Sequence, residues 1–132
     1  MNPRDMPSRL RTIALWLLAV FFILAGLNHF LSPGPYLGMM PAYLPWHREL
    51  ILMSGAAEMV GGMAILVPRL RVAAGWGLIA LLLAVFPANL HVALHGWEGV
   101  QIPAWVLWAR LPVQGLFLAW VWWTCIGRDA TR

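Results

Sequence analysis

Four apolar stretches occupy most of this 132-residue chain, at residues 12–31, 50–67, 72–95 and 104–126. An α-helix needs about 20 predominantly apolar residues to cross the hydrocarbon core of a bilayer, and each stretch is close to that length or longer. Inside lipid, backbone polar groups must be bonded within the segment, which favours helices over irregular chain. The sequence therefore predicts an all-α, four-transmembrane-helix bundle, with residues 1–132 forming a single membrane domain.

The composition supports a membrane protein and argues against a soluble one. Hydrophobic residues make up 61% of the chain and charged residues only 11%, which is too few to wet the surface of a soluble domain. The net charge is +4 and every basic residue is an arginine that flanks or interrupts an apolar stretch. Because the arginines are not clustered on a polar domain, we expect a lipid bilayer and no nucleic acid as the partner of these charges.

The arginines also predict the orientation of the bundle. With four spans, most of them fall on the side of the two termini: Arg4, Arg9, Arg11, Arg69, Arg71, Arg128 and Arg132. Cytoplasmic loops of membrane proteins are enriched in such residues, so both termini are expected in the cytoplasm. The short loops fit a multi-pass protein of a bacterial inner membrane, which is the location that we expect.

The segment between the first two spans is rich in proline. Pro33, Pro35, Pro41 and Pro45 fall within residues 33–45, and this density predicts that no regular helix forms there. Most of the remaining residues are apolar, so the loop is expected to lie at the membrane interface or to fold over the mouth of the bundle.

Small residues spaced four apart predict close contacts between helices. The pairs are Ala57 and Gly61, Ala73 and Gly77, and Gly115 and Ala119. Such spacing lets two helix backbones approach each other in lipid.

Polar side chains within the spans fall in one half of the bundle, away from the termini. Glu58 and Arg110 have opposite charges and similar predicted depths, and an unpaired charge at such depth is costly. We therefore expect them to pair, directly or through water. The residues expected to line one polar pocket are His29, Ser54, Glu58, Asn89, Arg110 and Gln114. The alternative is a structural clamp that holds the second and fourth spans together.

Histidine and cysteine do not complete a metal or redox site in this sequence. His91 and His95 are four apart and His29 ends the neighbouring span, but no aspartate or second cysteine accompanies them. Cys125 is alone, so a dithiol relay within the chain is excluded, and a small buried or lipid-facing residue is expected there. No metal site is predicted.

Several short motifs resemble those of the DoxX-like family of small four-helix membrane proteins. In chain order they are AGLNHF at 25–30, PAYLP at 41–45, SGAAE at 54–58, FPAN at 86–89 and RLPVQ at 110–114. The characteristic polar positions of that family correspond to His29, Glu58, Asn89, Arg110 and Gln114. The resemblance implies a four-helix membrane fold. It also implies an accessory role in quinone-linked oxidation, in oxidative-stress complexes or in membrane-protein assembly.

Two functions follow as hypotheses. The first is a non-enzymatic accessory or scaffold component of a membrane complex, with a membrane-protein partner or a second copy of the chain docked on its helices. The alternative is a quinone- or lipid-binding redox accessory subunit, whose polar cluster would hold the headgroup of the ligand. A transporter is less favoured, because four helices without an inverted repeat are few for alternating access. The chain has no self-contained catalytic motif and no cofactor motif, so a quinone would be its only expected cofactor.

Overall fold

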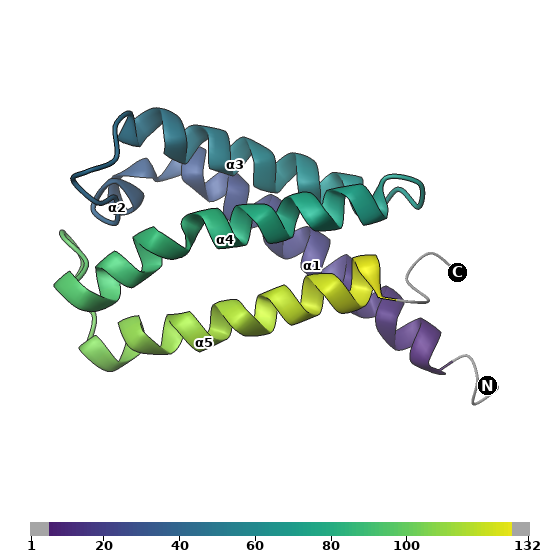
Figure 1. Ribbon diagram of the computed structural model, residues 1–132. Coiled ribbons are helices and arrows are strands. Elements are labelled where there is room, and N and C mark those ends of the chain that lie inside the picture. The colour runs from purple at the N-terminus through teal and green to yellow at the C-terminus, as the bar shows by residue number, and fades with distance from the viewer. Residues whose placement is uncertain (1–5, 128–132) are drawn as a thin grey trace.

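The computed structural model describes residues 6–127, in which all regular structure is helical (Figure 1). The elements are α1 (Met6–Leu31), α2 (Pro33–Leu37), α3 (His47–Ala64), α4 (Arg71–His95), α5 (Ala104–Val121) and the π-helical turn η1 (Trp122–Ile126). Three segments are long and apolar enough to cross a membrane, namely Arg9–Leu31, Arg71–His95 and Ala104–Ile126. Large apolar side chains are exposed along all three, as lipid contact requires. The protein is therefore an all-helical, multi-pass membrane protein.

α3 differs from these three segments in length and in charge. It has 18 residues, which span about 27 Å at 1.5 Å per residue, and it includes Arg48, Glu49 and Glu58. The predicted crossing by this helix, the fourth of the bundle, stays a prediction. So does the cytoplasmic placement of the termini, and three of the arginines on which it rests, Arg4, Arg128 and Arg132, lie outside the described residues.

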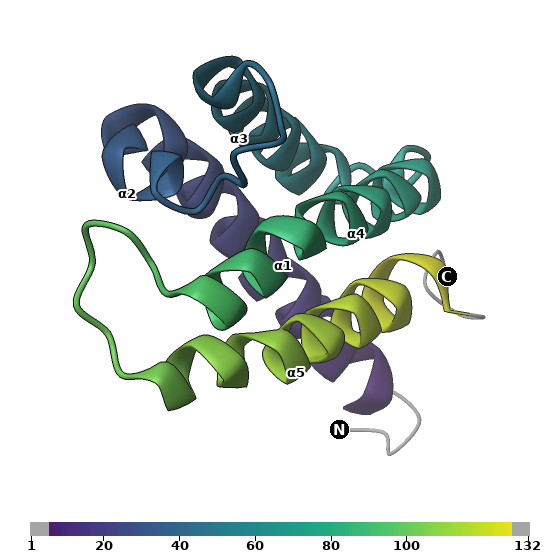
Figure 2. The same cartoon turned by 60° about the vertical axis from the view of Figure 1, so that its left-hand side comes forward.

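The four long helices pack side by side in two pairs. α1 lies along α3, and α4 lies along α5 and also contacts α3 (Figures 1 and 2). The first turns of α1, the α3–α4 turn and η1 share one end of the bundle, whereas α2 and the α4–α5 loop share the other (Figure 1). Near the first end, the Trp120 indole donates a hydrogen bond of 3.0 Å to the Ala14 carbonyl and so fastens α5 to α1.

Three glycines let α1 and α3 approach closely. A Cβ at Gly55 would lie 2.6 Å from His29 Cβ, and one at Gly62 would lie 2.9 Å from the Ala19 carbonyl oxygen. A Cβ at Gly26 would meet the Gly55 carbonyl oxygen. The predicted use of Gly77 and Gly115 for close helix contact is wrong within the described chain, because each faces open space.

The second helix does not have the bounds that its apolar pattern predicts. Residues 50–67 were expected, but α3 begins at His47 and ends at Ala64. Leu66 and Val67 donate to carbonyls three residues earlier, as in a 3₁₀ turn. Pro68 explains this early end, because the residue before a proline avoids the α conformation.

The proline-rich loop contains a short helix, so the prediction of no regular helix there is wrong for α2. Pro33 and Pro35 both lie in its first turn, where a missing N–H costs nothing and the fixed φ angle suits a helix. The next residues turn back across the end of the bundle. Met39 is buried against Val92 and Leu107, so the loop packs on the helices as a lid.

The bundle is solid at one end and hollow at the other. The largest cluster of buried apolar side chains lies at the end with the α3–α4 turn and consists of Leu15, Leu18, Ala19, Phe22, Ile65, Leu78, Val121 and Cys125. Cys125 is fully buried there, one of the two positions predicted for it. The opposite end holds a cavity beneath the lid.

Candidate functional site

A cavity of about 460 Å³ lies between the four long helices, toward the end that bears α2. Its floor is apolar and includes Phe21, Phe22 and Phe117; the rings of Phe21 and Phe117 stack with centroids 4.6 Å apart. Tyr36 and Met39, from the lid, line the opposite side. The volume falls within the range of small-molecule pockets, roughly 300–1,000 Å³.

All six residues predicted to form a polar cluster line this cavity. One wall, formed by α1 and α3, carries His29, Ser54 and Glu58. The facing wall, formed by α4 and α5, carries Asn89, Arg110 and Gln114. The structure thus brings together residues that are up to 85 positions apart in the chain, His29 and Gln114 being the extremes. Ligand binding by this cluster stays a prediction.

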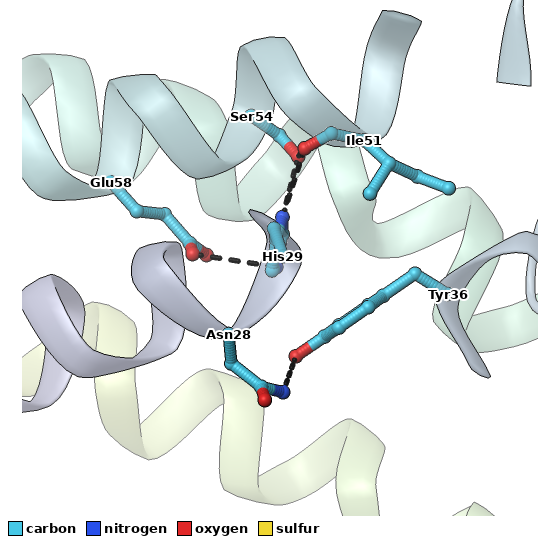
Figure 3. A network of polar contacts seen from close by, with 6 residues as sticks. All are labelled: Asn28, His29, Tyr36, Ile51, Ser54 and Glu58. Carbon is cyan, nitrogen blue, oxygen red and sulfur yellow. Dashed lines mark hydrogen bonds and ion pairs between the residues drawn. The ribbon is translucent and has the colours of Figure 1, made fainter. Parts of the chain in front are cut away.

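The α1–α3 wall is organised around His29 (Figure 3). Its Nδ1 lies 3.0 Å from the Ile51 carbonyl oxygen and 3.1 Å from Ser54 Oγ, whereas its Nε2 lies 3.5 Å from Glu58 Oε2. The Ser54 hydroxyl donates to the Ile51 carbonyl at 2.9 Å. The close approach of Gly55 to His29 Cβ sets this arrangement, because a side chain at residue 55 would push the ring away.

The α4–α5 wall is a hydrogen-bonded chain of three side chains. Arg110 Nη2 donates to Asn89 Oδ1 at 3.2 Å, and Asn89 Nδ2 donates to Gln114 Oε1 at 2.5 Å. Gln114 Nε2 in turn donates to the Leu82 carbonyl oxygen at 2.6 Å. Pro87 lies inside α4 and cannot donate a backbone hydrogen bond, so the helix is weakened in this region. The bond from Gln114 to the Leu82 carbonyl lies in this region and ties α5 to α4.

Glu58 and Arg110 do not form a direct ion pair, so the prediction of direct pairing is wrong. Glu58 Oε2 lies 3.5 Å from His29 Nε2, on its own wall, and Arg110 is hydrogen-bonded to Asn89, on the other. The guanidinium of Arg110 also stacks over the Trp97 ring, 4.7 Å from its centroid. Each charge has a nearer partner than the opposite charge, because the cavity lies between the two walls.

Each wall nevertheless presents one buried polar atom that has no hydrogen-bond partner within the protein. These atoms are Glu58 Oε2, an acceptor, and Arg110 Nη1, a donor. Leaving such groups without partners in a medium of low dielectric constant costs several kcal/mol, by order of magnitude. A molecule in the cavity that offers an acceptor to Arg110 and a donor to Glu58 would satisfy both.

Tyr36 lines the cavity and Trp97 packs on Arg110, although neither is among the six residues predicted for the polar cluster. The Tyr36 ring lies 4.1 Å from the His29 ring, and its hydroxyl accepts a hydrogen bond of 2.7 Å from Asn28 Nδ2 (Figure 3). Trp97 Nε1 donates to the Pro35 carbonyl at 2.6 Å, which joins the α4–α5 loop to α2. The only sequence signal for these two residues is that each is an aromatic residue with a polar group, located in a largely apolar loop.

Replacing Trp97 with phenylalanine is expected to loosen the lid. The ring over Arg110 is kept, but the donor to Pro35 is lost, at a cost of about 1 kcal/mol. Hydrogen–deuterium exchange of residues 33–40 should therefore become faster. Trp105→Phe, on the exposed Trp105, is the matched control and should leave the exchange unchanged. Equal exchange in wild type and Trp97→Phe would show that the indole hydrogen bond does not hold the lid.

The remaining histidines lie outside the main cavity. His91 and His95 stack with ring centroids 4.5 Å apart beside a second hollow, under the α4–α5 loop. Among residues 6–127, no group of three or more histidine, cysteine, aspartate or glutamate side chains is placed to hold a metal ion. His47 begins α3, and its Nε2 lies 3.0 Å from the Pro41 carbonyl oxygen.

Comparison with known proteins gives one family. No curated protein and no solved structure matches the chain significantly. A family model described as a domain of unknown function, DUF8561, matches residues 18–125. That range includes every residue of the two cavity walls. Because it covers most of the 132 residues, the chain belongs to the DUF8561 family.

Proposed function

We propose that this protein is a four-span membrane protein that binds the polar head of a lipophilic small molecule in the cavity between its helix pairs. The observation that carries the proposal is the pair of buried atoms without a hydrogen bond, Glu58 Oε2 and Arg110 Nη1, on opposite walls of one cavity. A structural clamp would bring these groups together, whereas they stand apart with space between them.

The path of the ligand tail follows from which lining residues are also exposed. Phe21 on α1 and Val113 on α5 both line the cavity, and they are 44% and 45% exposed. The cavity therefore reaches the outer surface between α1 and α5. In a bilayer that surface faces acyl chains, so a hydrocarbon tail can lie in lipid while the head lies inside.

α3 serves in this proposal as the fourth crossing, with both termini in the cytoplasm. Its length of about 27 Å is slightly short of a hydrocarbon core of about 30 Å, a mismatch that bilayers accommodate. The close packing on α1, through Gly26, Gly55 and Gly62, supports a crossing that is held by protein contacts. The resemblance to DoxX-like proteins supports the same arrangement, and a bacterial inner membrane suits it.

A quinone is one headgroup that fits these residues. Arg110 Nη1 is a buried donor for a carbonyl oxygen, and the aromatic floor would pack against a flat ring. The chain would then serve as a redox accessory subunit, with the electron-transfer groups supplied by a partner protein.

A second candidate is an accessory or scaffold role in a membrane complex. Gly77 on α4 and Gly115 on α5 are exposed with nothing within 4 Å of a Cβ, so they leave room for another helix to pack closely. In this case the polar walls would stabilise the fold, and the partner would be a membrane protein or a second copy of the chain.

The ligand-binding proposal predicts a co-purifying molecule. Mass spectrometry of small molecules extracted from protein in mild detergent should detect one lipophile near stoichiometric amount in wild type. Arg110→Ala should lower its amount about tenfold or more, because a charge-assisted hydrogen bond is lost. Arg48→Ala is the matched control, since Arg48 is exposed and outside the cavity. Bulk phospholipid alone, equal in all three proteins, would overturn the proposal and favour the scaffold role.

A further inference from the structure

The proton on His29 can be placed from its hydrogen-bond partners. Nδ1 lies within hydrogen-bond distance of the Ile51 carbonyl oxygen, which can only accept. The Ser54 hydroxyl also donates to that carbonyl, so its oxygen has a lone pair free to accept from Nδ1. Both contacts are satisfied only when Nδ1 carries a proton. The other ring nitrogen, Nε2, is then the one that gains or loses a proton.

Nε2 of His29 faces Glu58 Oε2 across 3.5 Å (Figure 3). This separation is longer than a charge-assisted hydrogen bond, about 2.7–2.9 Å. When Glu58 is ionised and Nε2 carries no proton, two lone pairs face each other and repel, and one proton placed between them turns the repulsion into a hydrogen bond. Glu58 Oε2 has no other donor within the protein. The pair is therefore an acceptor for one proton, at the surface of the cavity.

We propose that the His29–Glu58 pair takes up a proton from a weakly acidic lipophile, whose resulting anion is held by Arg110. The ligand class is a hydrocarbon-bearing molecule with an ionisable hydroxyl group, such as a phenol or an enol. This inference rests on the proposed function, because it places the headgroup in the same cavity.

The proton and charge balance is simple. The O–H bond of the headgroup breaks, a hydrogen is bound between Oε2 and Nε2, and the oxygen left behind carries the negative charge. Arg110 Nη1, the buried donor without a partner, lies on the facing wall to hold that oxygen. No electron leaves the headgroup, so the step needs no oxidant, and the total charge of the cavity is unchanged.

Other polar groups around the pair do not compete for the proton. From the lid, the Tyr36 ring packs on His29, and its oxygen already accepts from Asn28 of α1. From α4, Asn89 is bonded to Arg110 and Gln114, and amides do not titrate. Among the residues that line the cavity, the only charged side chain besides the pair itself is Arg110 on α5.

A nitrophenol that bears a hydrocarbon chain tests the inference, because its visible absorption changes when the hydroxyl ionises. The probe is added to wild-type protein in lipid nanodiscs, in weak buffer, at a pH where the free probe stays protonated. Saturable binding is expected with the phenolate spectrum and with no proton released to the medium, since the proton stays on the pair. Arg110→Ala should weaken binding about tenfold or more.

Variants of the acceptor separate this inference from the proposed function. Glu58→Gln should still bind the probe, but with the spectrum of the neutral phenol. Glu49→Gln, the same change on an exposed residue of α3, should behave as wild type.

Saturable binding of the neutral phenol by wild type would overturn the proton transfer but would still support binding in the cavity. A phenolate spectrum with Glu58→Gln equal to wild type would also overturn it, since Arg110 alone would then ionise the probe. An absence of saturable binding by wild type would overturn the inference as well, and the mass spectrometric comparison would then decide the proposed function separately.

Discussion

Replacing Gly26 with leucine is expected to force α1 and α3 apart and to cause the largest loss of stability of any single substitution proposed for this protein. Even a Cβ at Gly26 would meet the Gly55 carbonyl oxygen and would lie 2.7 Å from Met59 Cγ. Two of the atoms in the way, the Gly55 oxygen and Met59 N, are backbone and cannot move aside alone. Overpacking costs about 1–3 kcal/mol where side chains can shift, so a loss of about 3 kcal/mol or more is expected.

Thermal unfolding in detergent, followed by tryptophan fluorescence, measures this loss. Gly77→Leu is the matched control, because Gly77 is also in a helix, α4, but has nothing within 4 Å of a Cβ. It should keep or slightly raise the melting temperature, since leucine is a better helix former than glycine by less than about 1 kcal/mol. Equal melting temperatures for the two variants would contradict the close approach of α1 and α3.

The contact at Gly26 also bears on the cavity. His29 lies one turn further along α1, and Gly55, beside Ser54, faces both Gly26 and His29. The same close approach that stabilises α1 against α3 therefore brings His29 within reach of Glu58. Stability of the helix pair and the geometry of the polar wall depend on one set of backbone contacts.

The sequence predicted the spans and the membership of the polar cluster better than the contacts within it. Long apolar stretches predict helices because lipid leaves the backbone no other partner, and all three segments that qualify as crossings lie within predicted spans or extend them slightly. Glu58 and Arg110 stand out because charges are rare at such depth. Their direct pairing was wrong, since it depends on which helices are neighbours and on the width of the cavity between them, and pairing through water stays a prediction.

Close helix contacts could not be assigned from small residues alone. Gly77 and Gly115 each lie four residues from an alanine, the spacing found at many helix–helix interfaces in membranes, yet both face open space. Gly26 and Gly55 form the tightest approach between two of the long helices, but the role of each can be recognised only when the partner helix is known. Likewise, Tyr36 and Trp97 reach the site because α2 folds back over the bundle, which depends on packing of Met39 in the lid.

Replacing Gln114 with leucine is expected to break the α4–α5 wall. The Leu82 carbonyl would lose the donor that lies 2.6 Å away, and Asn89 Nδ2 would lose its acceptor. Leaving the Asn89 amide without its acceptor costs about 1–3 kcal/mol, whereas the Leu82 carbonyl lies inside α4 and keeps the backbone donor that a helix supplies. Gln101→Leu, the same change at an exposed loop position, is the control and should alter stability little.

A double-mutant cycle shows whether the loss comes from the hydrogen bond between Asn89 and Gln114. Unfolding of wild type, Asn89→Leu, Gln114→Leu and the double variant is measured in detergent under the same conditions. Because replacing both partners leaves no unpaired group between them, the double variant should lose less stability than the two single variants added together, by about 1 kcal/mol. Strict additivity would mean that the two amides do not interact, and the wall would then be held by the Gln114 bond to the Leu82 carbonyl and the Arg110 bond to Asn89. Coupling would instead establish that the two amides join α4 to α5, next to the bond that Asn89 accepts from Arg110.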